Sequence, residues 1–206
     1  MVLCIIPLCI GTVQGVDSDE QVLASGGRTD YRVVIAKSAG PQVKAVAEDF
    51  CRIFQQMTGA KIPLVTDEEP MGKHEIIIGP SKHLDELAMY IDWDALGEEG
   101  YVIRTQPGRL ALFGGPRGGT RNAVYEFLDE QLGCRFYAPE FTAIPKHPTL
   151  RIGILHIEEV PVFEARNVNC TQISDPYWAS RNRLNLIFRD SRNWRTAGID
   201  AGYRDG

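Results

Sequence analysis

The stretch FGGPRGGTRNAVYEFLDEQLG, residues 113–133, contains the residue types that most often hold a phosphate: four glycines and an arginine between an apolar strand and a helix. Backbone N–H groups at the start of a helix attract anions, and Arg117 and Arg121 would add positive charge. A Walker loop, however, requires GxxxxGK[ST], and this loop has no lysine. The dinucleotide pattern GxGxxG also fails, because the glycines come as two adjacent pairs. The glycine-rich stretch therefore matches neither nucleotide-binding pattern, and a weak anion site is the only form of ligand binding that it still permits.

Packing offers a second interpretation of the same residues. The helix that follows the glycines has an apolar face, and its acidic residues Glu126, Asp129 and Glu130 are expected to face water. That apolar face comprises Val124, Phe127, Leu128 and Leu132. Burial of four large apolar side chains contributes about 1.5–3 kcal/mol each. Glycine permits a positive φ angle and a close approach of two backbones, so we interpret this glycine corner, residues 114–119, as a tight turn that folds the helix onto a sheet.

No metal or cofactor site is predicted. Cys51, Cys134 and Cys170 are widely spaced and show no CxxC pattern. The four histidines also lack the short spacings that metal ligands on a helix require; they are His74, His83, His147 and His156. We expect core thiols and surface imidazoles.

Composition and charge limit the possible partners. The chain has 206 residues and a formal net charge of −5, which provides no basic field for nucleic acid. The apolar segment MVLCIIPLCIGTVQG, residues 1–15, is too short to cross a bilayer and suits a secretory signal peptide cut after Gly15. A buried N-terminal strand is the alternative. We therefore expect a secreted, periplasmic or extracellular protein without stable membrane insertion.

The remaining pattern predicts an α+β domain. Residues 16–29 are acidic and then glycine-rich, which indicates a linker. A helix is expected from Pro41 to Gly59 and another over residues 120–132, and a Pro-Gly pair predicts a β-hairpin over 100–115. Further strands are expected at 31–37, 61–65, 74–79, in CRFYAP and in TLRIGIL, with a weak helix at 81–90. We predict a two-layer sandwich with a mostly antiparallel sheet and two main helices on one face.

Several of these segments resemble a known group of enzymes. The segments FCRIFQQMTGAKIPLV, GEEGYVIRT and LFGGPRGGTRNAVYEFLDEQLGCRFYAPE look like the N-terminal α/β domain of large secreted glycoside hydrolases, including α-glucuronidases and β-hexosaminidases. The resemblance covers about residues 30–155 and is specific in the glycine corner and the residues after it. In those relatives, this accessory domain precedes a (β/α)8 barrel and carries no catalytic carboxylate.

The resemblance implies a boundary near residue 158. Residues 30–157 would be the accessory domain, and 158–206 the first β/α unit of a truncated (β/α)8 barrel, which needs about 250 residues. PVFEARNVN, residues 161–169, would be the first barrel strand, and residues 178–188 the first barrel helix or the segment that approaches it. We expect a fragment that folds through about residue 155 and is sensitive to proteases beyond residue 160.

Arg166 is the one candidate binding residue. In the hexosaminidase-like relatives, F-x-x-R on the first barrel strand places an arginine against sugar hydroxyls, and Phe163 and Arg166 have this spacing here. A guanidinium presents a planar set of donors suited to vicinal hydroxyls or a uronate carboxylate. The alternative is a structural ion pair with Glu164, Asp175 or Asp190. An asparagine follows Arg166 where the relatives often have glycine, which weakens the correspondence.

The resemblance thus implies part of a glycoside hydrolase whose carbohydrate substrate binds in the barrel. The catalytic residues of the relatives lie on later barrel strands, so no catalytic residue is identified here, and we expect the chain itself to be inactive. The accessory domain would pack against the barrel within the same polypeptide. The alternative is a non-enzymatic module that binds glycans or scaffolds a surface complex.

Overall fold

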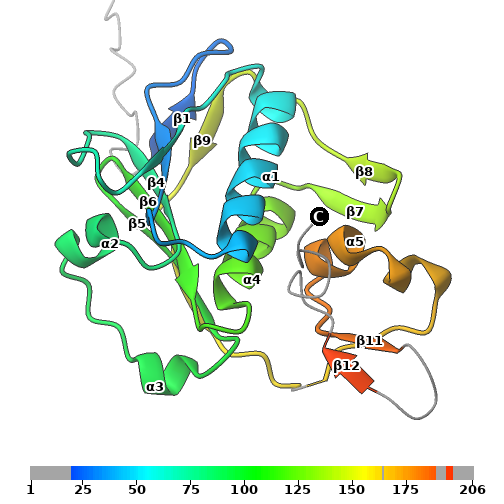
Figure 1. Cartoon of the computed structure of the whole chain (residues 1–206). Coiled ribbons are helices and arrows are strands. Elements are labelled where there is room, and N and C mark those ends of the chain that lie inside the picture. The colour runs from blue at the N-terminus through cyan, green and yellow to red at the C-terminus, as the bar shows by residue number, and fades with distance from the viewer. Residues whose placement is uncertain (1–19, 164, 189–193, 197–206) are drawn as a thin grey trace, which may run out of the picture.

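The computed structural model describes residues 20–163, 165–188 and 194–196 (Figure 1). The signal peptide expected at residues 1–15 lies outside this part of the chain. Within it, no helix combines the length and the apolar character that crossing a membrane would require.

A six-stranded mixed sheet forms the centre of the fold, with the strand order β10-β5-β6-β4-β2-β3. The strands are β2 (Arg32–Ile35), β3 (Leu64–Thr66), β4 (Glu75–Ile78), β5 (Tyr101–Gln106), β6 (Arg109–Gly114) and β10 (His156–Glu159). The pairs β2–β3, β2–β4 and β4–β6 are parallel, whereas β5–β6 and β5–β10 are antiparallel. The prediction of a mostly antiparallel sheet is therefore wrong. A helix between β2 and β3 carries the chain back to the end from which β2 started, and this crossover makes the two strands parallel.

Two helices, α1 (Pro41–Thr58) and α4 (Gly119–Glu126), lie on one face of the sheet, as predicted (Figure 1). Pro41 begins α1, and Gly59 ends it with a left-handed φ of 80°. A short π-helix, η1 (Phe127–Gln131), continues α4. Side chains from both helices and from the sheet form one core, which includes Phe50, Phe54 and Phe127.

The opposite face of the sheet is also covered, so a two-layer description is incomplete. Two short helices, α2 (Lys82–Glu86) and α3 (Trp93–Leu96), lie there. Leu84 and Leu96 pack with the side chains of β4, β5 and β6 that point to this side, including Ile77 and Phe113. All four residues of β4 are buried, as expected for a central strand.

The predicted hairpin is confirmed, because β5 and β6 pair in register around a turn with Gly108 at φ 72°. The interpretation of residues 16–29 as a linker, in contrast, is wrong for part of that range. Gln21–Ala24 forms strand β1, which pairs with β9 (Leu150–Ile152), and the Leu23 side chain is fully buried. The apolar pair Val22-Leu23 has polar residues before it and small residues after it, so the sequence shows no strand pattern here.

The chain after β10 departs from the expected barrel unit. The strand β10 itself crosses the boundary placed at residue 158, and the described residues of 161–169 form no strand. A 3-10 helix, η2 (Thr171–Ser174), leads into α5 (Pro176–Arg181) and the hairpin of β11 (Leu186–Phe188) and β12 (Trp194–Thr196). Residues 178–188 do not form one helix, because α5 ends at Arg181 and β11 begins at Leu186. Another hairpin, β7 (Arg135–Ala138) with β8 (Phe141–Ala143), lies beside α5 (Figure 1).

Candidate functional site

The glycine corner packs directly against the loop that precedes β5. A Cβ atom on Gly115 would lie 2.1 Å from the Gly97 carbonyl oxygen, and one on Gly119 would lie 2.3 Å from that of Gly100. Gly115 N–H donates to the Gly100 oxygen at 2.8 Å, and Arg117 N–H donates to the Glu98 oxygen at 2.9 Å. The two backbones are therefore too close for any side chain at these glycines.

This packing leaves little for an anion. The N–H groups of Gly115, Arg117 and Gly119 all donate to backbone carbonyl groups. The Arg121 side chain is only 2% exposed and lies against Asn122, with Nη2 3.2 Å from the Asn122 Oδ1. The corner therefore has the geometry of the predicted tight turn.

The loop that precedes β5 also carries Glu99, which binds Arg166 and Asn185. We define these three residues as the Glu99 cluster. Asn122 Nδ2 donates to the Glu99 carbonyl oxygen at 3.1 Å and so holds the Glu99 backbone on the helix α4. The Glu99 carboxylate accepts from Arg166 Nη2 at 2.6 Å and from Asn185 Nδ2 at 3.0 Å. Asn185 Oδ1 in turn accepts from the Arg166 backbone N–H at 2.8 Å, which closes a ring of hydrogen bonds.

Arg166 therefore pairs with a carboxylate that sequence reasoning did not consider. Its Nε donates to the Arg183 carbonyl oxygen at 2.9 Å, and its Nη1 donates to that of Phe163 at 2.8 Å. Of the expected partners, Asp175 caps α5 by accepting from Trp178 N–H, while Glu164 and Asp190 lie outside the described residues. The side chain of Arg166 is 19% exposed. The segment GEEG, with its glutamates between two glycines, was the signal that could have indicated Glu99.

A docking loop, residues 182–185, joins this cluster to the helix α4. Arg183 donates to Glu126 at 2.5 Å and to Asp129 at 3.2 Å, and it has a left-handed φ of 57°. Asn182 Nδ2 donates to the Phe136 carbonyl oxygen at 3.1 Å. Glu126 and Asp129 were expected to face water and instead bind this loop, whereas Glu130 is exposed. The expectation was wrong for these two residues because periodicity identifies the apolar side of a helix but not what packs against the polar side.

A second carboxylate, Asp49 on α1, binds the helix α5. It accepts from Arg181 Nε at 2.9 Å, from Arg52 Nη2 at 2.5 Å and from the Tyr125 hydroxyl at 3.1 Å. Burial disfavours the charged carboxylate, but hydrogen bonds and charge from Arg181 and Arg52 outweigh this effect and hold the pKa of Asp49 below its ordinary value. Tyr125 shows the opposite behaviour, because burial and the neighbouring Asp49 raise the pKa of its hydroxyl.

The pKa of Glu126 is raised despite its ion pair. Burial is the largest cause, and nearby Glu159, Glu130 and Asp129 add to it, while Arg183 opposes it. Close by, the Tyr101 hydroxyl donates to Glu159 Oε2 at 2.8 Å. A half-buried glutamate with a raised pKa among other carboxylates is a feature of functional sites, but structural ion pairs produce it as well.

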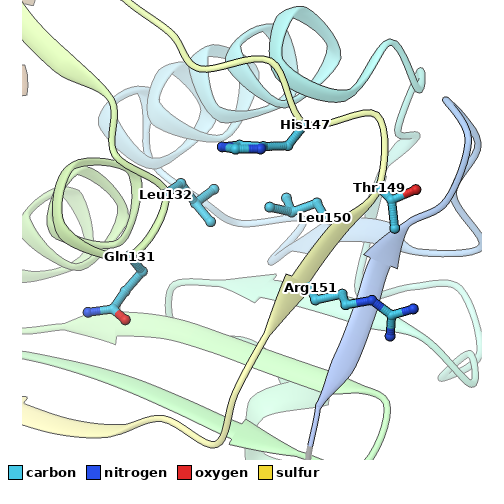
Figure 2. A pocket seen from close by; sticks show the side chains of 6 residues that line it. All are labelled: Gln131, Leu132, His147, Thr149, Leu150 and Arg151. Carbon is cyan, nitrogen blue, oxygen red and sulfur yellow. The ribbon is translucent and has the colours of Figure 1, made fainter. Parts of the chain in front are cut away.

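Other places in the described part of the chain offer less. A hollow of about 240 Å³ is lined by Gln131, Leu132, His147, Thr149, Leu150 and Arg151 (Figure 2). Among these six residues, only the side chains of Leu132 and Leu150 are buried, so the hollow lies open at the surface. No group of three or more metal-ligating side chains was found among the described residues.

Comparison with known proteins identifies the fold. No family model and no curated protein sequence matches the chain. Among solved structures, a family GH115 4-O-methyl-α-glucuronidase with specificity for decorated arabinogalactans superposes with a TM-score of 0.53 at 19% identity, over 80% of this chain. A Streptomyces plicatus β-hexosaminidase in complex with its product superposes with a TM-score of 0.46 at 12% identity, over 72% of this chain.

The chain spans only about a quarter of the length of these two proteins, at 25% and 24% respectively. The superposition on the glucuronidase shows that the chain shares a fold with part of a glycoside hydrolase. At this level of identity, the likeness applies to the fold alone.

Proposed function

We propose that this chain contributes the accessory domain of a secreted glycoside hydrolase, with a catalytic domain that begins near residue 158. In this proposal the chain itself hydrolyses no glycoside, and Arg166 contributes to the carbohydrate site of the larger protein. The observation that carries the proposal is the superposition on a glucuronidase over 80% of this chain.

The geometry of Arg166 supports a binding role. Three of its five N–H groups donate to acceptors from Phe163, Arg183 and Glu99. The described residues supply no acceptor for the other two, and the side chain retains some exposure. A guanidinium that is fixed on one side and open on the other is suited to a sugar hydroxyl pair or a uronate carboxylate.

The proposal can be tested on the chain as it exists. Isotope-labelled arginine side chains would be followed by NMR while glucuronic acid or N-acetylglucosamine is added. We expect one of these sugars to shift the Arg166 guanidinium signals, which are identified by their absence from the spectrum of Arg166→Lys. Arg151, an exposed arginine, provides the matched control, since Arg151→Lys should leave the response unchanged.

Two results would contradict this proposal. If neither sugar affects Arg166, its binding role is lost. Turnover of aryl glycosides by the chain alone, at a rate that survives purification to homogeneity, would contradict the inactive accessory role.

A non-enzymatic glycan-binding module is the second candidate, and one observation favours it. Tyr137 and Phe141 on the β7–β8 hairpin are 63% and 60% exposed, and their rings stack with centroids 5.8 Å apart. Exposed aromatic faces can pack against sugar rings. Retention on a glycan affinity gel that is lost in Tyr137→Ala, without any effect of Arg166→Lys, would favour this candidate over the first.

A further inference from the structure

The glycine corner and the Arg166 side chain are connected by an unbroken series of contacts. The corner fixes the loop 97–100 by close packing, because a Cβ atom on Gly115 would lie 2.1 Å from the Gly97 oxygen. This loop carries Glu99, whose backbone is also held by Asn122. Glu99 then binds the guanidinium of Arg166. Each contact in this series lies among described residues.

We propose that Glu99 is a positioning residue for Arg166, and that the glycine corner acts through Glu99 to orient this guanidinium. The ligand to which Arg166 would be presented rests on the function proposed above, but the positioning itself does not. The glycines of the corner would then serve the binding site indirectly, without touching a ligand.

The hydrogen bonds around Glu99 define one orientation of Arg166. The acceptors of the guanidinium come from three segments: the loop 97–100, the docking loop 182–185 and residue 163. If the guanidinium were bound only by the carbonyl oxygens of Arg183 and Phe163, it could still rotate about the line that joins these two oxygens. The carboxylate of Glu99 adds a charge-assisted bond at the third nitrogen, which removes that freedom.

Asn185 binds both Glu99 and Arg166 and so connects the two residues. Its amide nitrogen donates to the Glu99 carboxylate, while its amide oxygen accepts from the Arg166 N–H. The backbone N–H of Asn185 also donates to the Arg166 carbonyl oxygen at 3.2 Å. Asn185 thus holds the backbone of Arg166, and Glu99, to which Asn185 also donates, holds its side chain. Glu99 is 15% exposed and Arg166 is 19% exposed, so water competes only weakly for these bonds.

The test measures the exchange of the Arg166 Nε proton with water by NMR in the whole chain. The Nε proton is bonded to the Arg183 carbonyl oxygen, whereas Glu99 binds Nη2, so exchange at Nε reports the orientation of the guanidinium. In Glu99→Ala the guanidinium is free to tilt away from the Arg183 oxygen, and we expect exchange at Nε to become about tenfold faster or more. Glu99→Gln should give an intermediate rate, since its amide oxygen accepts without a charge. The neighbouring Glu98, which is 62% exposed, supplies the matched control, and Glu98→Gln should leave the rate unchanged.

A remote arginine shows whether each variant stays folded. Arg32 Nε donates to the buried Glu75 at 3.0 Å, and its exchange should not change in any of these variants. Gly115→Ala tests the first step: the added Cβ must displace the loop 97–100, so exchange at Arg166 should accelerate while Arg32 is unaffected. Should Gly115→Ala fail to fold, the Glu99 variants still decide the question.

The outcomes separate this inference from the proposed function. An unchanged Arg166 exchange rate in both Glu99 variants, with Arg32 intact, would overturn the positioning role whatever the sugars do. Faster exchange in Glu99→Ala, together with no sugar response in the unmodified chain, would leave the positioning role standing and contradict the carbohydrate site. A Glu98→Gln variant that behaves as Glu99→Gln does would show a general charge effect and would also overturn the inference.

Discussion

The replacement Asp49→Asn tests whether the ion pair with Arg181 holds the helix α5 on the domain. It removes a charge from a side chain that is 8% exposed and leaves Arg181, at 13% exposure, without its counter-ion. Breaking a fully buried ion pair costs about 3–5 kcal/mol. Arg52 is 46% exposed and can return to water, and asparagine can still accept a hydrogen bond. We therefore expect a loss of about 2–3 kcal/mol in the free energy of unfolding.

The pH dependence of this loss follows from the lowered pKa of Asp49. A carboxyl group with a lower pKa in the folded state contributes stability above its unfolded pKa, and this contribution disappears as the pH falls through the folded pKa. The difference in the free energy of unfolding between the unmodified chain and Asp49→Asn should therefore be largest at pH 7 and become smaller below about pH 4. Urea denaturation followed by circular dichroism at several pH values measures it.

The control is an ion pair of similar length at the surface. Glu68 binds Lys37 at 2.6 Å, but the two side chains are 51% and 67% exposed. Glu68→Gln should cost less than about 1 kcal/mol. The reasoning would be refuted by an Asp49→Asn loss no larger than this, or by a loss that stays constant between pH 7 and pH 3.

Three further predictions concern other parts of the chain. Leu23→Ala should destabilise by about 2–5 kcal/mol in urea denaturation because Leu23 is fully buried in β1, whereas Val22→Ala, at a residue 39% exposed, should have a small effect. Burial raises the pKa of Cys134 to about 11, so iodoacetamide at pH 8 should label this thiol slowly in the folded chain and quickly in urea, as mass spectrometry would show. Glu75→Gln should lower the melting temperature at pH 7 and have less effect at low pH. Burial alone would raise the pKa of Glu75, but hydrogen bonds from the Gly72 N–H and from Arg32 outweigh this effect and lower the pKa, so the carboxylate stabilises the fold only while it is charged.

Local signals predicted the elements whose ends are fixed by backbone chemistry. Pro41 and Gly59 bound α1 as expected, and Pro107-Gly108 forms the turn of the hairpin. In these cases the residue that sets the φ angle is itself visible in the sequence. The buried run of isoleucines in β4 likewise indicated a central strand.

Strand direction and short strands depend on information that lies far away in the chain. The hairpin suggested an antiparallel sheet, although the crossover through α1 requires a parallel pair at β2 and β3. β1 has only four residues, and its partner β9 begins at Leu150. Four residues are too few to show the alternation of apolar and polar side chains by which a strand is recognised in a sequence. The segment is a strand because its backbone pairs with β9, and this partner lies far away in the chain.

The polar side of α4 shows why the candidate site could not be derived from the sequence. Glu126 and Asp129 were assigned to solvent because their spacing places them opposite the apolar face, and that geometry was right. Their partner Arg183 lies 57 and 54 residues later and reaches them only because the docking loop folds back on the domain. The same holds for Glu99 and Arg166, which are 67 residues apart. A charged side chain at an exposed position of one element is a candidate contact for another, and only the path of the chain decides between water and a partner.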